Sequence, residues 1–152
     1  MKLLLTRELG RLAKWLRIMG VDAEYSRQKN NASLVIQALK EERTILTRNH
    51  RLPAARGIKI AVLKEELLRL QLEEVFELLG LAPQPEELFT RCTVCNLRLA
   101  DIGKDKVKDK VPEYVFQTQE KFLTCPSCGR IYWQGTHRNN VEKALKAINS
   151  KT

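Results

Sequence analysis

The chain has 152 residues and a net charge of +9, from 27 Lys and Arg against 18 Asp and Glu. Hydrophobic residues make up 43% of it, enough for the core of one domain or of two small ones. We expect no membrane segment, because no run of 18 apolar residues occurs, and no secretory signal, because Arg7 and Glu8 interrupt the apolar start. These features favour a protein of the reducing cytoplasm, where paired cysteines hold metal more often than they form disulfides.

Positive charge is concentrated in the first part of the chain. Residues 1–63 hold 13 basic and 5 acidic side chains, whereas residues 64–79 hold five glutamates against two basic residues. A surplus of this size is typical of a protein that binds RNA or DNA, because phosphate contacts supply most of the affinity in such binders. A basic surface without a ligand would carry the same charge, so both interpretations stay open.

Short apolar runs alternate with amphipathic segments over the first 80 residues. Gly20 is placed to end the first helix, and Asn31 is a candidate cap for the second. Strands that alternate with helices form a parallel sheet with right-handed crossovers, so we predict an α/β domain. Its predicted strands are residues 2–5, 22–25, 44–47 and 58–62, and its predicted helices are residues 8–19, 31–42 and 64–79.

The carboxyl ends of these strands are the expected place for a ligand. Polar and basic residues follow three of the strands, namely Thr6-Arg7, Ser26-Arg27 and residues 47–50. Helical spacing of 100° puts Arg7, Arg11 and Lys14 on the solvent face of the first helix, with Arg17 to one side. We predict that seven basic side chains contact RNA phosphates, unless they are ordinary solvated surface: Arg7, Arg11, Lys14, Arg17, Arg27, Arg48 and Arg51.

The second part of the chain has a different character. Residues 81–89 contain Pro83 and Pro85 and are interpreted as a linker, so the predicted domains are residues 1–80 and 90–152. Residues 103–110 look like a solvated loop. The predicted strands of this part are residues 111–116, 122–123 and 131–133, and a final amphipathic helix is predicted at residues 138–148.

Two pairs of cysteines predict a metal site in this second part. Cys92 and Cys95 form one C-x₂-C knuckle, and Cys125 and Cys128 form another, with 29 residues between them. Each knuckle directs two sulfurs at one point, and two knuckles make a closed tetrahedral site, which is typical of structural zinc. Iron in the same geometry and two disulfides are the alternatives. A closed site leaves no open position for water, so we expect no catalytic role for this metal.

Four groups of residues form a recognisable pattern: residues 9–17 with Gly20 and Asp22, residues 45–48, residues 111–116, and residues 125–133 with 135–137. Together they resemble the Mut-seven C-terminal RNase domain family, a PIN-like domain followed by a zinc ribbon. The resemblance covers nearly the whole chain. The fold implied is a PIN-like parallel sheet with flanking helices, then a small β-rich zinc ribbon and a C-terminal helix.

The activity that this resemblance implies is RNA cleavage by carboxylates that hold Mg²⁺ or Mn²⁺ at the strand ends, where the metal activates water. The sequence departs from the family pattern at three positions, where Thr6, Asn31 and Asn49 stand in place of acids. Glu8 is the acid that remains within reach of the site. One carboxylate does not build a two-metal centre, so the sequence leaves the metal chemistry in doubt.

Three functions are therefore open: a ribonuclease, an RNA-binding module without catalysis, and a protein-interaction domain. Cleavage without metal would need two imidazoles as general base and general acid acting on the 2′-hydroxyl, and the candidates are His50 and His137. Loop and capping roles for these histidines are the simpler alternative. For Trp15 and for the pair Tyr132 and Trp133, we expect packing rather than base stacking.

Overall fold

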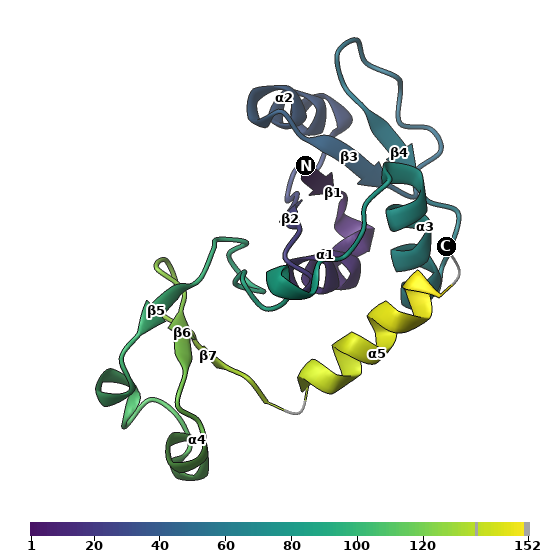
Figure 1. The fold of residues 1–152 in the computed structure, drawn as a ribbon. Helices are drawn as coiled ribbons and strands as arrows, with labels where there is room; N and C mark the ends of the chain where they lie inside the picture. Colours follow the sequence, from purple (N-terminus) through teal and green to yellow (C-terminus); the bar gives the residue numbers. More distant parts are fainter. Residues whose placement is uncertain (136, 151–152) are drawn as a thin grey trace.

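A four-stranded parallel sheet forms the centre of the first domain (Figure 1). The computed structural model describes residues 1–135 and 137–150, without the side chains of residues 137, 148 and 149. The order of the strands is β2-β1-β3-β4, and every pair is parallel, as predicted. The strands are β1 (Lys2–Leu5), β2 (Asp22–Tyr25), β3 (Thr44–Thr47) and β4 (Ile60–Val62).

Helices cover both faces of this sheet, because successive residues of a strand point to opposite sides. Leu3 and Leu5 pack with α1 (Gly10–Ile18) and α3 (Leu68–Leu79), whereas Leu4 packs with α2 (Asn31–Glu41) on the other face. A 3₁₀ turn, η1 (Arg7–Leu9), joins β1 to α1. Gly20 has φ of +84°, and a Cβ there would lie 2.4 Å from the carbonyl oxygen of Glu87, so the position requires glycine.

Several predicted boundaries of this domain differ from the structure. The cap of α2 is Asn30, whose Oδ1 accepts from the Ser33 N–H at 2.8 Å, and not Asn31. Helix α3 begins four residues later than predicted, because the Glu74 carboxylate accepts from the N–H groups of residues 64 and 65 and holds them outside the helix. Strand β4 begins at Ile60 rather than at residue 58.

The cysteine-containing part is built on a three-stranded antiparallel sheet in the order β5-β6-β7. Residues 111–116 were predicted as a strand, but Pro112 precedes a short helix there, and Val115 on that helix is buried in a small core with Val107 and Phe122. The sequence analysis also missed β5. The elements are β5 (Ala100–Ile102), η3 (Lys104–Val107), α4 (Glu113–Thr118), β6 (Phe122–Thr124) and β7 (Ile131–Trp133).

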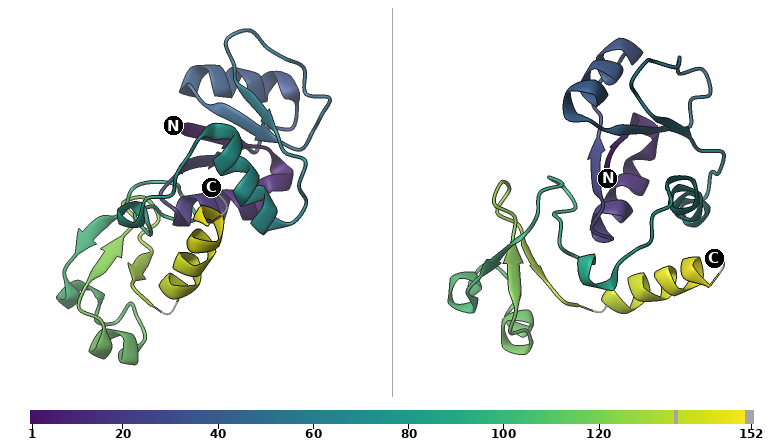
Figure 2. Two further views of the ribbon diagram at one scale, coloured as in Figure 1. Left: turned by 45° about the vertical axis from the view of Figure 1, so that its right-hand side comes forward. Right: turned by 45° about the horizontal axis from the view of Figure 1, so that its top comes forward.

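The last helix, α5 (His137–Asn149), leaves the ribbon and runs along the α/β domain (Figures 1 and 2). Its Val141 and Leu145 are buried in the same core as α1 and α3. Leu88 of the linker, beside η2 (Pro85–Glu87), belongs to that core as well. No helix in the described ranges has the length and apolar character needed to cross a membrane.

Candidate functional site

Four cysteine thiols meet where the two knuckles face each other. Their Sγ atoms all lie within 4.8 Å of one another, and the Sγ atoms of Cys92 and Cys128 are 3.8 Å apart. That separation is far longer than a disulfide bond of about 2 Å, and it matches the edge of about 3.8 Å of a tetrahedron with metal–sulfur distances of about 2.3 Å. The four-cysteine cluster could therefore hold a metal ion.

The electrostatics of the thiols also favour a cation. Burial opposes ionisation of Cys92, but the Tyr132 hydroxyl at 3.1 Å and backbone N–H groups outweigh it and lower its pKa to about 6. At Cys95, desolvation and contacts with Cys128 and Cys125 raise the pKa to about 11. Neighbouring thiols thus disfavour a second negative charge, and a divalent cation would remove that repulsion.

The first knuckle is bonded to the α/β domain. Arg17 is 6% exposed, and its guanidinium donates to the carbonyl oxygens of Ala23, Thr93 and Val94 at 2.8–3.0 Å. Burial lowers the pKa of Arg17, although Glu24 and the nearby cysteines oppose that shift. The structure therefore gives Arg17 a role that the sequence did not predict, because its side chain holds the knuckle against α1 and β2. Little of this side chain is exposed for the predicted contact with phosphate.

Asn96, directly after the first knuckle, closes the edge of the parallel sheet. Its Oδ1 accepts from the Ala23 N–H at 3.0 Å, and its Nδ2 donates to Asp22 at 2.7 Å. Burial opposes ionisation of Asp22, but the bonds from Arg43 and Asn96 outweigh it and lower the pKa of Asp22. Asn96 was not predicted as a functional residue. Its position in the sequence could have indicated it, because Asn96 follows the first knuckle as Gly129 follows the second.

At the carboxyl end of the sheet, three hydrogen-bond donors surround one carboxylate. The Oε1 of Glu8 accepts from Thr6 Oγ1 at 2.6 Å, from Thr47 Oγ1 at 3.2 Å and from the Arg48 N–H at 2.9 Å. Partial burial opposes ionisation of Glu8, but these bonds outweigh it and lower its pKa. By accepting these hydrogen bonds, the Glu8 carboxylate connects the end of β1 to the end of β3. It lies in the place where the resemblance implies a metal.

The three residues that stand in place of the family's acids lie with Glu8 at one pocket of about 140 Å³. Thr6, Glu8, Asn31 and Asn49 line it, and Glu8 is the one acid among the lining residues that the structure describes. His50 is exposed in the turn that follows and does not line the pocket.

The two histidine segments are not brought together. The loop after β3 and the first turn of α5 lie at different ends of the molecule in Figures 1 and 2. The side chain of His137, and with it the predicted role of that imidazole, lies outside the described residues.

The other six basic residues that were predicted to contact phosphates differ in their exposure to solvent. Arg48 is half-buried and donates to Glu66 at 2.9 Å. Five others are exposed near the carboxyl ends of the strands or along α1, where a phosphate backbone could reach them: Arg7, Arg11, Lys14, Arg27 and Arg51.

Comparisons with known proteins place this arrangement in a family. No curated protein and no solved structure matches the chain. The family model described as Mut7-C RNAse domain matches residues 1–145, which is nearly the whole chain. This match confirms the resemblance seen in the sequence, and the parallel sheet, ribbon and terminal helix agree with it. The chain therefore belongs to the Mut7-C RNAse domain family.

Proposed function

We propose that this protein binds RNA and does not cleave it through Mg²⁺ or Mn²⁺ at the sheet edge. The family supports an RNA-related role. The observation that carries the proposal is the environment of Glu8: three donors converge on its Oε1, whereas a divalent cation requires converging acceptors. Thr6 and Asn49, which line the same pocket, are neutral and do not balance the charge of such a cation.

For the four-cysteine cluster we propose a structural zinc ion. The thiol spacing and the closed set of four sulfurs fit tetrahedral Zn²⁺. Such an ion would hold the two knuckles together, and through Arg17 and Asn96 it would keep the ribbon on the α/β domain. Its chemistry there is structural, because four protein ligands leave no position for water or substrate.

Exposed basic residues at the start of α1 are the proposed phosphate contacts. Arg7, Arg11 and Lys14 follow one another at helical spacing from the carboxyl end of β1 along α1. A helix rises about 1.5 Å per residue, so this row extends over roughly 10 Å. Affinity built on such contacts falls steeply as the salt concentration rises.

The test combines binding and cleavage on the same single-stranded RNA, with arms that contain EDTA, Mg²⁺ or Mn²⁺. We expect equal binding in all arms and no cleavage that depends on metal. Replacing both Arg7 and Arg11 with Gln should weaken binding about tenfold and reduce the slope of log affinity against log salt by about 1 to 1.5.

A matched control changes the same charge at the other end of the strands. Lys40 precedes β3 and Lys59 precedes β4, and both are exposed. Their double replacement with Gln should leave the affinity within about twofold. Cleavage that requires Mg²⁺ and is lost in Glu8→Gln would show that the sheet edge is a working metal site and that the proposal is wrong.

A further inference from the structure

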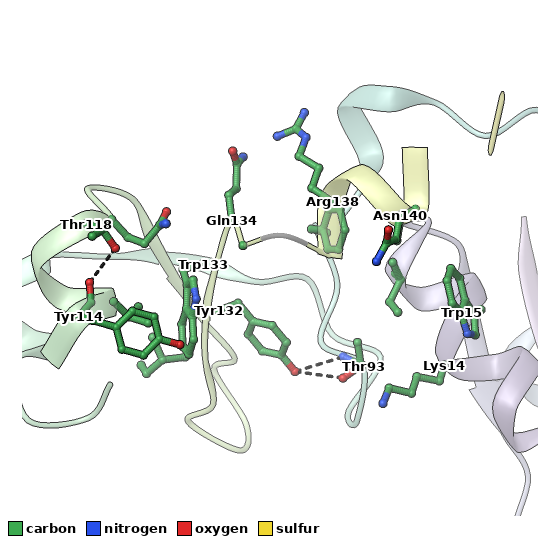
Figure 3. Close-up of a pocket in the computed structure, with 17 residues that line it drawn as sticks. Lys14, Trp15, Thr93, Tyr114, Thr118, Tyr132, Trp133, Gln134, Arg138 and Asn140 are labelled. Atoms are coloured by element: carbon green, nitrogen blue, oxygen red, sulfur yellow. Dashed lines mark hydrogen bonds between the residues drawn. The ribbon is translucent and has the colours of Figure 1, made fainter. Parts of the chain in front are cut away.

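A second hollow in the structure lies away from the sheet edge. A cleft of about 670 Å³ opens between the two parts of the molecule. Helix α1 forms one wall, α4 and β7 of the ribbon form the second, and the first turns of α5 form the third (Figure 3). Because α5 packs on the α/β core, the walls formed by α1 and α5 belong to one packed unit.

Aromatic residues are concentrated in this cleft. Five of the nine aromatic residues of the chain line it, including both tryptophans. Tyr114 is 70% exposed and Trp133 is 36% exposed. The Trp133 ring contacts Phe122 with centroids 6.5 Å apart, which supports it from the core. Figure 3 shows Tyr114 and Trp133 together on the ribbon side, with Trp15 across the hollow on α1. The ribbon side of the cleft therefore offers exposed ring surface.

The predicted packing role does hold for Tyr132. Its hydroxyl accepts from the Thr93 N–H at 3.2 Å and contacts the Cys92 thiol at 3.1 Å, so it connects the ribbon sheet to the first knuckle. The exposed pair Tyr114 and Trp133 is different, because both rings reach solvent.

The charge of the lining is complementary to a polyanion. Lys14 and Arg138 line the cleft, and no Asp or Glu is among the described lining residues. Arg138 Nε donates to Glu142 one helical turn further along α5, outside the lining. Lys14 is also the last of the exposed basic residues that run along α1 from the sheet edge. A phosphate backbone that follows this row therefore arrives at the cleft.

Side-chain amides complete the chemistry. Gln119, Gln134 and Asn140 line the cleft, and each amide offers both donors and an acceptor, as the edges of nucleobases require. Aromatic faces with neighbouring cations and amides are the means by which proteins hold unpaired bases. A double-stranded nucleic acid would not present its base faces to these rings.

We propose that the cleft between the α/β domain and the ribbon binds single-stranded RNA, with bases stacked on Trp133 and Tyr114 and phosphates at Lys14 and Arg138. The inference rests on the proposed RNA-binding function and specifies where the bases lie. The cleft differs from the row of phosphate contacts formed by Arg7, Arg11 and Lys14, because aromatic as well as basic side chains would determine the affinity of the cleft for RNA.

The position of the tryptophans allows RNA binding in the cleft to be measured by fluorescence. Trp15 and Trp133 are the two tryptophans of the chain, and both line the cleft. Titration of the zinc-loaded full chain with a short single-stranded oligoribonucleotide should therefore quench the intrinsic tryptophan fluorescence, since a stacked base quenches an indole. An RNA duplex of the same length should quench much less.

Two ring variants and a matched control test the determinants. Tyr114→Ala should weaken binding about tenfold, because stacking on one ring contributes about 5- to 100-fold in affinity. Trp133→Phe keeps a ring and should bind nearly as well as the unchanged protein, with reduced quenching, whereas Trp133→Ala should weaken binding as Tyr114→Ala does. The control Leu67→Ala truncates an equally exposed side chain outside the cleft and should have no effect.

The outcomes separate the two proposals. One result would overturn the cleft as the base site and keep the proposed function. In that result, the Arg7 and Arg11 double variant binds RNA more weakly, Tyr114→Ala binds as the unchanged protein does, and RNA does not quench the tryptophan fluorescence. That result would make the cleft a surface for a different partner, such as a protein. If the unchanged chain binds no RNA at low salt, both proposals fail.

Discussion

The two cysteine knuckles have the same backbone and different surroundings. In the first, the Cys92 N–H donates to Leu97, and Asn96 stands in the left-handed region with φ of 63°. In the second, the Cys125 N–H donates to Arg130, and Gly129 has φ of 71°. Each turn thus satisfies the same rule: the residue after the second cysteine adopts positive φ.

Their environments separate them. Cys92 is fully buried and Asn96 is 5% exposed, because the first knuckle lies against α1 and β2. The residues from Pro126 to Arg130 are exposed, and a Cβ at Gly129 would meet nothing within 4 Å. The same local motif can therefore contact the α/β domain in one copy, whereas in the other copy it only positions its two cysteines.

The difference follows from the edge of the parallel sheet. Strand β2 lies at that edge, and an uncovered edge strand exposes backbone groups to unwanted pairing. The Ala23 N–H donates to Asn96, and the Ala23 carbonyl accepts from Arg17, so the first knuckle covers this edge. The second knuckle meets no such edge, and glycine there serves the turn alone.

Loss of the proposed zinc ion should have the largest effect, and it should affect the second knuckle more than the first. Cys125→Ser removes one ligand, and because zinc binding supplies on the order of 10 kcal/mol to such folds, the ribbon should unfold. Hydrogen exchange should then become fast over residues 125–130 but remain partly protected over residues 92–97, which keep their bonds to β2 and Arg17.

Ser127→Ala, an exposed change in the same knuckle that removes no ligand, is the control and should retain one equivalent of zinc. Equal and complete loss of protection in both knuckles would mean that the contacts to the α/β domain do not hold the first knuckle without its metal.

Removal of the Asn96 side chain should have the next largest effect. Asn96→Gly keeps the left-handed turn but leaves the buried Ala23 N–H without an acceptor and removes a donor from Asp22. We expect a loss of about 2 kcal/mol in the free energy of unfolding, measured by urea denaturation of the zinc-loaded protein. Asn96→Ala should lose about 1 kcal/mol more, because alanine is strained at positive φ. A neutral Asn96→Gly would show that water replaces the side chain at no cost.

Much of the fold could be predicted because the governing signals are local. The apolar runs Leu3–Leu5 and Ile45–Leu46 and the helical spacing around Leu12 and Leu16 specify the α/β layers without reference to the rest of the chain. The cysteine spacing did the same for the cluster. The division into residues 1–80 and 90–152 stays a prediction, although α5 follows the ribbon in sequence and packs on the α/β core.

What the sequence did not reveal depends on tertiary contacts. Arg17 carries a charge, so the sequence suggests an exposed side chain. It is buried because it donates hydrogen bonds to carbonyl oxygens 76 and 77 residues away in the sequence. The segment around Val115 has the apolar content of a strand, yet Pro112 starts a helix there. Two of the three donors to Glu8, from Thr47 and Arg48, lie about 40 residues away in the sequence, so no local pattern predicts that donors surround this acid.

The smallest effect is expected from the reciprocal change, Gly129→Asn, which places in the second knuckle the residue found in the first. Asparagine tolerates the left-handed region better than other residues do, and replacing glycine also reduces the entropy of the unfolded chain by about 0.4–1 kcal/mol. These terms nearly cancel, and open space surrounds the position, so the free energy of unfolding should change by less than about 0.5 kcal/mol. Gly129→Ala lacks this tolerance and should cost about 1 kcal/mol. A loss of 2 kcal/mol in Gly129→Asn, as large as that in Asn96→Gly, would mean that the second knuckle has contacts of its own and that the two copies do not differ in role.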